Sequence, residues 1–389
     1  MDKIYMDHIA GTPILPEALD AMMPFFKDNF GNPSSIHGFG EVAENALTES
    51  REKVGKLIAA EPEEILFTSC GTESNNFAFK GVPLARRSKG SHIVTTGIEH
   101  FSIMHTIKAM EKIGFEITQV PVDRFGRVDP DDVAKALTDH TVLVSIQHAN
   151  PEIGTIQPLA EIGKITRAKG VPLHTDAVAS AGILPINVKE MNVDLLSLAA
   201  NMFYGPKGAA ALYVRKGINI QPLLDGGIQE RGKRAGTENV PAIVGMGVAA
   251  EFALRDMEKR KEHMERLAQK LRSGLKQRIE HLLEFGHPDQ RLPGNVSLGA
   301  RFIEGESVLL FMDMAGIAIA SGSACISRSL KVSHVMLAMG VDHGDAQGSL
   351  LFTLGKDNTE AEVEKVFEAL PPIINRLRDM SPLYKRKTT

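Results

Sequence analysis

The stretch FTSCGTESNN, residues 67–76, combines the end of a strand, a turn of small residues and a helix start near Ser74. Free backbone N–H groups at the start of a helix bind anions. Gly71 and Thr72 are therefore candidates for a phosphate-binding turn. An ordinary capped helix start remains the simpler explanation for any single turn of this kind.

Two further residues could act on a cofactor ring. Asp176 follows the apolar run VPLHT, which predicts a carboxylate at the mouth of a sheet. There it can pair with the pyridinium nitrogen of pyridoxal phosphate and keep the ring an electron sink, or it can simply cap a helix. His100, in GIEHFS, can stack on such a ring. A lone histidine is more often a packing or capping residue.

The chain has two cysteines, Cys70 and Cys325. Cys325 lies in ASGSACISRS, a stretch rich in small residues, where a thiol can act as a nucleophile, a sulfur carrier or a metal ligand. A buried, inert cysteine is the simpler explanation, and it suits Cys70 better than Cys325. Two cysteines provide neither a disulfide framework nor a cysteine-based zinc site.

The stretch LAANMFYGPKG, residues 198–208, predicts a short buried strand that enters a tight turn. The turn carries Lys207. Asn201 and Met202 occupy the junction between strand and turn, where a reactive group is often presented. The spacing alone does not say whether Lys207 takes part in chemistry.

The elements that must position these residues alternate along the chain. Strand-like runs end near residues 68, 96, 147, 175, 198 and 214, with amphipathic stretches such as 40–58 and 158–169 between them. This alternation predicts a mostly parallel sheet with helices on both faces. Ligands of such sheets bind beyond the carboxyl ends of the strands, where the candidate residues fall.

A long helical pattern begins near Asn239, and its charge run is most simply a solvated helix face. A second αβ unit follows, with NVSLGA, GIAIASGSAC and a closing helix near residues 360–378. We expect a large domain over residues 16–260, and a small domain over residues 1–15 and 261–389 that carries the Cys325 loop.

Composition excludes several classes of protein. The chain has 389 residues, of which 43% are hydrophobic, and a net charge of −4 with both signs interspersed. No basic field favours nucleic acid, and no apolar run approaches the ~20 residues needed to span a bilayer. The sequence therefore predicts a cytoplasmic α/β protein without nucleic-acid or membrane partners.

The motifs occur together in one family. From YMDHIAGTP to DMSPLY the chain resembles the cysteine desulfurases of the NifS/IscS type, class V of the fold-type I pyridoxal-phosphate enzymes. The matching landmarks are FGNPSSIHGFG, FTSCGTES, EIGTIQP, HTDA, YGPKGAAALYV, GGIQERGKRAGTENVPAIVGMG, EGES and SGSAC. The resemblance implies an aminotransferase-like fold with a seven-stranded sheet, a homodimer, and sulfur transfer to an IscU-like scaffold in iron–sulfur cluster assembly.

The resemblance also implies roles for single residues. Gly71 and Thr72 match the phosphate loop, His100 the ring-stacking histidine and Asp176 the partner of the pyridinium nitrogen. Thr237 matches the threonine that reaches the phosphate of the neighbouring subunit. His100 and Cys325 are the catalytic residues that it implies, Cys325 taking sulfur as a persulfide. Cys325 is also the candidate metal ligand.

Six positions depart from the family pattern. The family's Schiff-base lysine stands where this chain has Met202, and Lys207 matches only the turn lysine. Asn201 replaces the family's neighbouring histidine, and Ala199 replaces its phosphate-binding serine. The other departures are Pro151 and Ala179, which replace an asparagine and a glutamine at the cofactor phenolate, and Leu351, which replaces the arginine that clamps the substrate carboxylate.

These losses remove the covalent anchor and the amine that would move the α-proton. A lost general base costs ~10²–10⁴-fold in rate, so efficient cleavage of free cysteine is not expected. The stacking, phosphate and ring-nitrogen contacts remain, and pyridoxal phosphate is therefore expected to bind without a covalent link or not at all.

Three hypotheses follow. The favoured one is a desulfurase-like protein with a degenerate site that handles sulfur, or ligates an iron–sulfur cluster shared with its scaffold, through Cys325, with inorganic sulfide as the sulfur source. The second is an active pyridoxal-phosphate cysteine desulfurase, converting cysteine to alanine with a substitute amine. The third is a structural partner of an active paralogue.

Overall fold

The computed structural model describes residues 3–322 and 332–384. Its largest element is a seven-stranded sheet in the order β2-β8-β7-β6-β5-β3-β4. Only β8 runs against its neighbours in this sheet. The strands are β2 (Ile65–Thr68), β3 (His92–Thr96), β4 (Glu116–Val120), β5 (Thr141–Ser145), β6 (Leu173–Asp176), β7 (Leu195–Ala199) and β8 (Ala210–Val214).

Both faces of the central strands of this sheet are buried, because successive apolar side chains along a strand point to opposite faces of the sheet. In β2, Ile65 and Phe67 pack into one apolar core while Leu66 packs into the core on the opposite face. In β7, Leu196 packs into the first of these cores and Leu195 into the second. A strand with apolar residues on both faces is typical of a sheet covered by helices on both sides.

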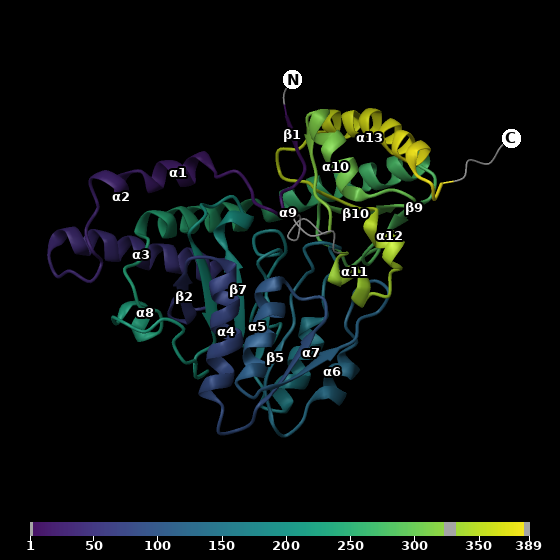
Figure 1. Ribbon diagram of the computed structural model, residues 1–389. Coiled ribbons are helices and arrows are strands. Elements are labelled where there is room, and N and C mark those ends of the chain that lie inside the picture. Colours follow the sequence, from purple (N-terminus) through teal and green to yellow (C-terminus); the bar gives the residue numbers. More distant parts are fainter. Residues whose placement is uncertain (1–2, 323–331, 385–389) are drawn as a thin grey trace.

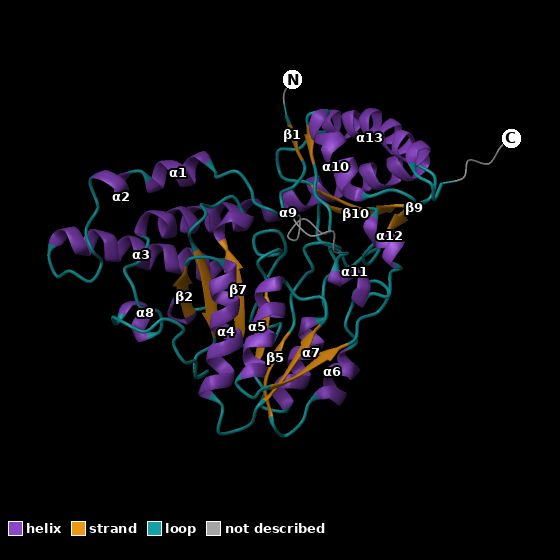
Figure 2. Cartoon of the chain, in the orientation of Figure 1, coloured by secondary structure: helices purple, strands orange, loops and turns teal. Residues whose placement is uncertain are grey.

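Helices cover the two faces (Figure 2). The elements of this part are α1 (Pro16–Met22), α2 (Pro24–Lys27), α3 (Gly38–Leu57), η1 (Pro62–Glu64), α4 (Gly71–Ala85), α5 (Phe101–Lys112), α6 (Pro130–Ala136), α7 (Leu159–Ala168), η2 (Ala200–Met202) and α8 (Gln229–Gly232). The helices α4 and α5 begin within a few residues of the ends of β2 and β3, so the first turn of each lies at the carboxyl edge of the sheet.

A smaller part, with its own core, stands above the large sheet in Figure 1. It holds an antiparallel sheet in the order β12-β10-β9 and a parallel pair of β1 and β11. Its elements are β1 (Ile4–Tyr5), β9 (Leu282–Glu284), β10 (Asn295–Ala300), α10 (Gly305–Met314), β11 (Ile317–Ala318), α11 (His334–Ala338), α12 (His343–Gln347), β12 (Ser349–Thr353) and α13 (Glu360–Met380).

The helix α9 (Val240–Arg278) joins the two parts. Its first half packs on the core of the large sheet through residues such as Ile243 and Met246, and its second half on the smaller core through Leu267 and Leu271. The chain therefore passes from one part to the other inside an unbroken helix.

The α/β fold with a mostly parallel seven-stranded sheet is confirmed. Sequence analysis missed β4, whose polar sequence EITQV is only partly buried at the sheet edge. The helix expected near Ser74 begins three residues earlier, at Gly71. The domain boundaries at residues 15 and 260 stay a prediction.

Candidate active site

The expected phosphate turn lies at the start of α4. Gly71 opens the helix, and the side chain of Val178 comes within 2.6 Å of the place where a Cβ would stand, so only glycine fits there. Thr72 is exposed in the first turn. Glu73 is held by Arg234 at 2.8 Å, which neutralises its carboxylate. The first N–H groups of α4 thus remain able to bind an anion.

A buried hydrogen-bond network connects Asp176 with His100. The Asn75 amide donates to Asp176 at 2.6 Å and to the Ser102 hydroxyl at 2.9 Å. The Ser102 hydroxyl lies 2.8 Å from His100 Nδ1, which also accepts the Ser102 N–H at 3.1 Å. Since Nδ1 accepts, the neutral ring carries its proton on Nε2.

The environment of Asp176 has opposing effects on the pKa of its carboxyl group. Burial raises the pKa of Asp176, while the charge of His100 and hydrogen bonds from the Val178 N–H and from Asn75 lower this pKa. The Val178 N–H donates at 2.9 Å. The aspartate therefore has partners within the fold itself, whether or not a pyridinium ring is present.

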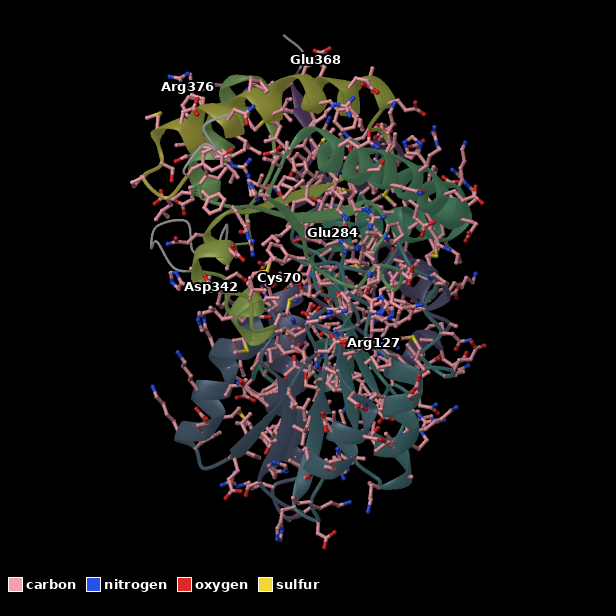
Figure 3. The ribbon with its side chains drawn as sticks, turned by 90° about the vertical axis from the view of Figure 1, so that its right-hand side faces the viewer. Cys70, Arg127, Glu284, Asp342, Glu368 and Arg376 are labelled. Atoms are coloured by element: carbon pink, nitrogen blue, oxygen red, sulfur yellow. The ribbon has the colours of Figure 1, made fainter. Side chains whose placement is uncertain are left out.

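Cys70 departs from the expectation of a buried, inert thiol, which is wrong for this residue. It is exposed at the N-cap of α4, where the backbone is extended. Figure 3 shows Cys70 at the level where the two parts of the molecule meet.

The position of the family's lysine is buried. Met202 ends η2, directly after β7, and is 6% exposed. Its sulfur lies 3.5 Å from the amide nitrogen of Asn201, whose carbonyl accepts the N–H of Thr12 at 2.9 Å. Ala199, where the phosphate-binding serine was expected, is also buried. Lys207 is exposed on the following turn.

Met202 and Ala179 line a narrow, mainly apolar cavity of about 40 Å³, which we call the apolar cavity. Its described lining contains no carboxylate. It does contain one lysine, Lys356, which sequence analysis did not single out. The Lys356 ammonium is bound by both oxygens of Asp357 at 2.8 Å.

A second cavity, of about 170 Å³, lies beside His100, and we call it the acidic cavity. Three carboxyl groups line it, those of Asp7, Glu99 and Glu152. Leu351, at the clamp position, is 4% exposed and forms part of the wall, as does Pro151. The described lining includes no lysine or arginine that could receive a substrate carboxylate.

The pKa values of these three carboxyl groups are all raised. Burial raises the pKa of Glu99 and that of Glu152 to about 8 each, and raises the pKa of Asp7 to about 6. Glu99 accepts the Thr96 hydroxyl at 2.8 Å, and Glu152 accepts the Ser333 hydroxyl at 2.7 Å. One oxygen of each of the three carboxyls has no hydrogen-bond partner. An anionic ligand would gain no countercharge here.

The residues present match pyridoxal phosphate only in part. Gly71, Asp176 and His100 offer a turn, a buried carboxylate and a ring, but the apolar cavity presents a thioether where the imine would form. A thioether cannot form an imine with an aldehyde. The site therefore fits a non-covalent ligand and not the covalent anchor, and we derive no step through the cofactor.

Thr237 and Cys325 are the two remaining residues that the sequence predicted. Thr237 is exposed in the loop between α8 and α9, on the outside of a single chain. Cys325 lies outside the described residues. Within residues 3–322 and 332–384, no group of histidine, cysteine, aspartate and glutamate side chains could hold a metal ion.

Sequence analysis missed Asp7, Glu152, Asn75 and Lys356 as residues of these cavities and networks. The carboxylates Glu99 and Glu152 do stand within quoted motifs, next to His100 and at the start of EIGTIQP. Their burial, which is what makes them unusual, arises only when segments distant in the sequence meet.

Known proteins resemble this chain along nearly all of its length. Residues 4–366 match the family described as Aminotransferase class-V. "Cysteine desulfurase IscS" of Methanosarcina thermophila is 49% identical over 380 residues, which cover 98% of this chain and 94% of that protein. "Cysteine desulfurase IscS 1" of Archaeoglobus fulgidus is 44% identical, with coverage of 98% and 100%.

Solved structures agree. One titled "NIFS-LIKE PROTEIN" superposes with a TM-score of 0.91 at 37% identity, covering 96% of this chain and 100% of that one. Another, titled "SspA in complex with cysteine", gives a TM-score of 0.79 at 34% identity, with coverage of 92% and 100%. None of the described helices is long and apolar enough to cross a membrane.

Proposed function

The chain belongs to the class V aminotransferases and is similar to their cysteine desulfurases, and from that premise we propose that it no longer cleaves cysteine efficiently. It instead serves iron–sulfur cluster assembly through Cys325. The family depends on pyridoxal phosphate. The observation that carries this proposal is Met202, an apolar side chain buried at the position of the family's lysine.

A second feature supports the loss of cysteine cleavage. The substrate carboxylate would have to enter the acidic cavity, where Leu351 stands in place of an arginine. The described lining of this cavity has no lysine or arginine, and burying a substrate carboxylate without a cationic partner is unfavourable. Both the amine and the clamp are therefore missing.

The chemistry left to Cys325 is ligation or sulfur transfer. As a cluster ligand, its thiol gives up one proton and its thiolate sulfur binds iron, with no change of redox state. Sulfide alone cannot turn a thiolate into a persulfide, because that step removes two electrons. A persulfide on Cys325 requires a donor persulfide, whose terminal sulfur moves to Cys325 while the donor leaves as a thiolate. Ligation of a cluster shared with an IscU-like scaffold is the favoured role.

The proposal includes a homodimer, the usual state of cysteine desulfurases of this type. Large apolar side chains are exposed around α2 and the loop after it, including Phe26 (58%), Phe30 (70%) and Ile36 (107%). Figure 1 shows this arm projecting beyond the large sheet. A second copy would cover it and bring Thr237 to the neighbouring phosphate turn. We place this dimer in the cytoplasm.

The test is the exchange Cys325→Ser in the full-length protein, mixed with a scaffold protein, iron and sulfide. The variant should fold and dimerise normally, but the complex should lose its cluster absorbance in the visible range. Cys70→Ser is the matched control, since Cys70 is the other cysteine of the chain, its thiol is exposed, and it should not be required.

Retention of the cluster by the Cys325→Ser complex at the level of the unmodified complex contradicts the proposal. The protein would then act as a structural partner. Sulfide release from cysteine by the unmodified protein, at the rate of ordinary family members, supports an active desulfurase with a substitute amine. Lys356 is the first lysine to examine in that case, because it lines the apolar cavity with Met202.

A further inference from the structure

A groove of about 410 Å³ lies next to the apolar cavity, with which it shares Arg260 and Lys356. It runs between the start of α1, one face of α9 and the loop after β12. On α9 its lining residues recur every three or four positions, which is the spacing of a single helix face. We call it the cationic groove because of the basic residues that line it, which are Arg255, Lys259, Arg260, His263 and Lys356.

Cations outnumber carboxylates in this groove. Its lining has four permanent cations but only Glu17 and Asp256 as acids. Both oxygens of Asp256 already accept from Arg255, at 2.8 and 2.7 Å. Lys259 has no ion pair within 4 Å among the residues that the structure describes. The Lys356 ammonium is paired with Asp357, which does not line the groove. Lys259 and Arg260 are therefore the two cations of the groove that the protein leaves without a close carboxylate.

Arg260 makes this imbalance costly. It is 7% exposed, its Nη1 has no hydrogen-bond partner, and its closest carboxylate oxygen, on Asp256, is 3.7 Å from Nη2. Burial lowers the pKa of Arg260, but a guanidinium stays charged in proteins. A buried charge without a full partner destabilises the folded state, and an anion in the groove would offset that effect.

The wall of the groove is fixed in place by Tyr204. The Arg260 guanidinium lies 5.3 Å from the centre of its ring, and the Lys356 ammonium lies 5.2 Å from the same centre. The Tyr204 hydroxyl accepts the Lys356 N–H at 2.7 Å. Two cations are thus held against one ring before any ligand arrives, which reduces the entropy lost on binding.

We propose that the cationic groove binds a small multivalent oxyanion of the phosphate type. Ammonium and guanidinium groups are the side chains that bind phosphate. The chain as a whole has a net charge of −4 with both signs interspersed, so a long polyanion would meet repulsion beyond the groove. A bound anion would link α9 and α1 with the Lys356 loop of the smaller part.

The experiment follows the thermal unfolding of the full-length protein in increasing inorganic phosphate, and separately in pyrophosphate, with sodium chloride holding the ionic strength constant. A ligand that binds only the folded state raises Tm with the logarithm of its concentration above Kd. We expect this logarithmic rise with phosphate, and a larger rise at equal concentration with pyrophosphate because it carries more charge.

Two variants of the same helix distinguish the groove from general charge effects. Lys259→Gln should weaken phosphate binding about fivefold, the loss expected for one charge-assisted contact. Lys261→Gln is the matched control, because Lys261 lies two residues further on α9, on another face, and pairs with Glu258. Its phosphate response should equal that of the unmodified protein.

Three results would overturn the proposal. The first is an equal rise of Tm with chloride alone, and the second is an equal phosphate response of Lys259→Gln and Lys261→Gln. The third is an oligoglutamate peptide that binds in a Lys259-dependent manner while phosphate and pyrophosphate do not. In that case the groove is a docking surface for an acidic peptide.

Discussion

Restoring the lysine with Met202→Lys should create an amine without creating an efficient desulfurase. Met202 is 6% exposed, and the described lining of the apolar cavity has two cations, Arg260 and Lys356, but no carboxylate. The new amine would be desolvated and close to charges of its own sign. Both effects lower the pKa of a lysine, by as much as ~3–5 units when burial is complete.

The cost in stability can be estimated from this burial. An unsatisfied polar group inside a protein costs about 1–3 kcal/mol, so Met202→Lys should lower the free energy of unfolding by that amount. Met202→Leu is the matched control, because it keeps the volume and the apolar character of the side chain. Such exchanges cost less than about 1.5 kcal/mol.

The gain in activity should stay small because the clamp is still missing. Removing one partner of a buried charged pair costs about 2–5 kcal/mol. At ~1.4 kcal/mol for each factor of ten, Leu351 alone would keep kcat/KM roughly 30- to 5,000-fold below that of a relative with arginine. Pro151 and Ala179 remove further contacts from the cofactor.

The assay combines three measurements on the unmodified protein and on both variants. Each is incubated with pyridoxal phosphate, reduced with borohydride and mapped by mass spectrometry, and sulfide release from cysteine and Tm are recorded. The unmodified protein should carry no pyridoxyl group on Lys207, Lys233 or Lys356, and Met202→Lys should carry one on the new residue. Sulfide release by Met202→Lys at the rate of ordinary relatives would refute the reasoning, and so would an adduct on the unmodified protein.

Two predictions concern buried carboxylates. Burial raises the pKa of Glu152 in the folded state to about 8, above its ordinary value near 4.5, so the folded state keeps a proton that the unfolded state loses, and the protein loses stability as the pH rises between these values. In denaturant unfolding, the free energy of unfolding of Glu152→Gln should fall less steeply with pH, by at most ~1.4 kcal/mol per pH unit. An unchanged slope of this free energy against pH would contradict the prediction. Glu230→Ala should lower the free energy of unfolding by about 3–5 kcal/mol, because Glu230 is 5% exposed and binds Arg51 through two contacts of 2.7 Å. Breaking the exposed Glu61–Lys189 pair with Lys189→Ala, which keeps Glu61 as the N-cap of η1, should leave stability nearly unchanged. Equal effects of the two exchanges would show that burial is not the deciding factor.

Local patterns were sufficient to predict most of the fold. The apolar runs ending near Thr68, Thr96 and Leu198 are strands in the structure, and the long helix begins after Asn239 as expected. These elements depend on residues next to one another in the chain. The edge strand β4 was missed because half-polar sequences such as EITQV carry a weak apolar signal.

The cavities could not be predicted in the same way. The acidic cavity combines Asp7, Glu99, Glu152 and Leu351, which stand up to 344 positions apart in the sequence and meet only through tertiary packing. The pKa of each carboxyl depends on the water that this packing removes. Likewise, composition does not reveal that Cys70 is exposed at the N-cap of α4.

The pattern of retained and lost residues has a physical explanation. Asp176 keeps its hydrogen bonds to Asn75 and to the Val178 N–H whether or not a cofactor is present, so retaining it costs the folded protein little. A lysine at Met202 would have no such partner without cofactor, because the described lining of the apolar cavity has no carboxylate, and it would carry the penalty of an unpaired buried charge. Once cysteine cleavage ceased to be required, an apolar residue at this position would increase stability. Residues whose charge has a partner only when cofactor and substrate are bound are lost, while residues that have hydrogen-bond partners within the fold are retained. This is the pattern expected for a desulfurase fold that was kept for another function.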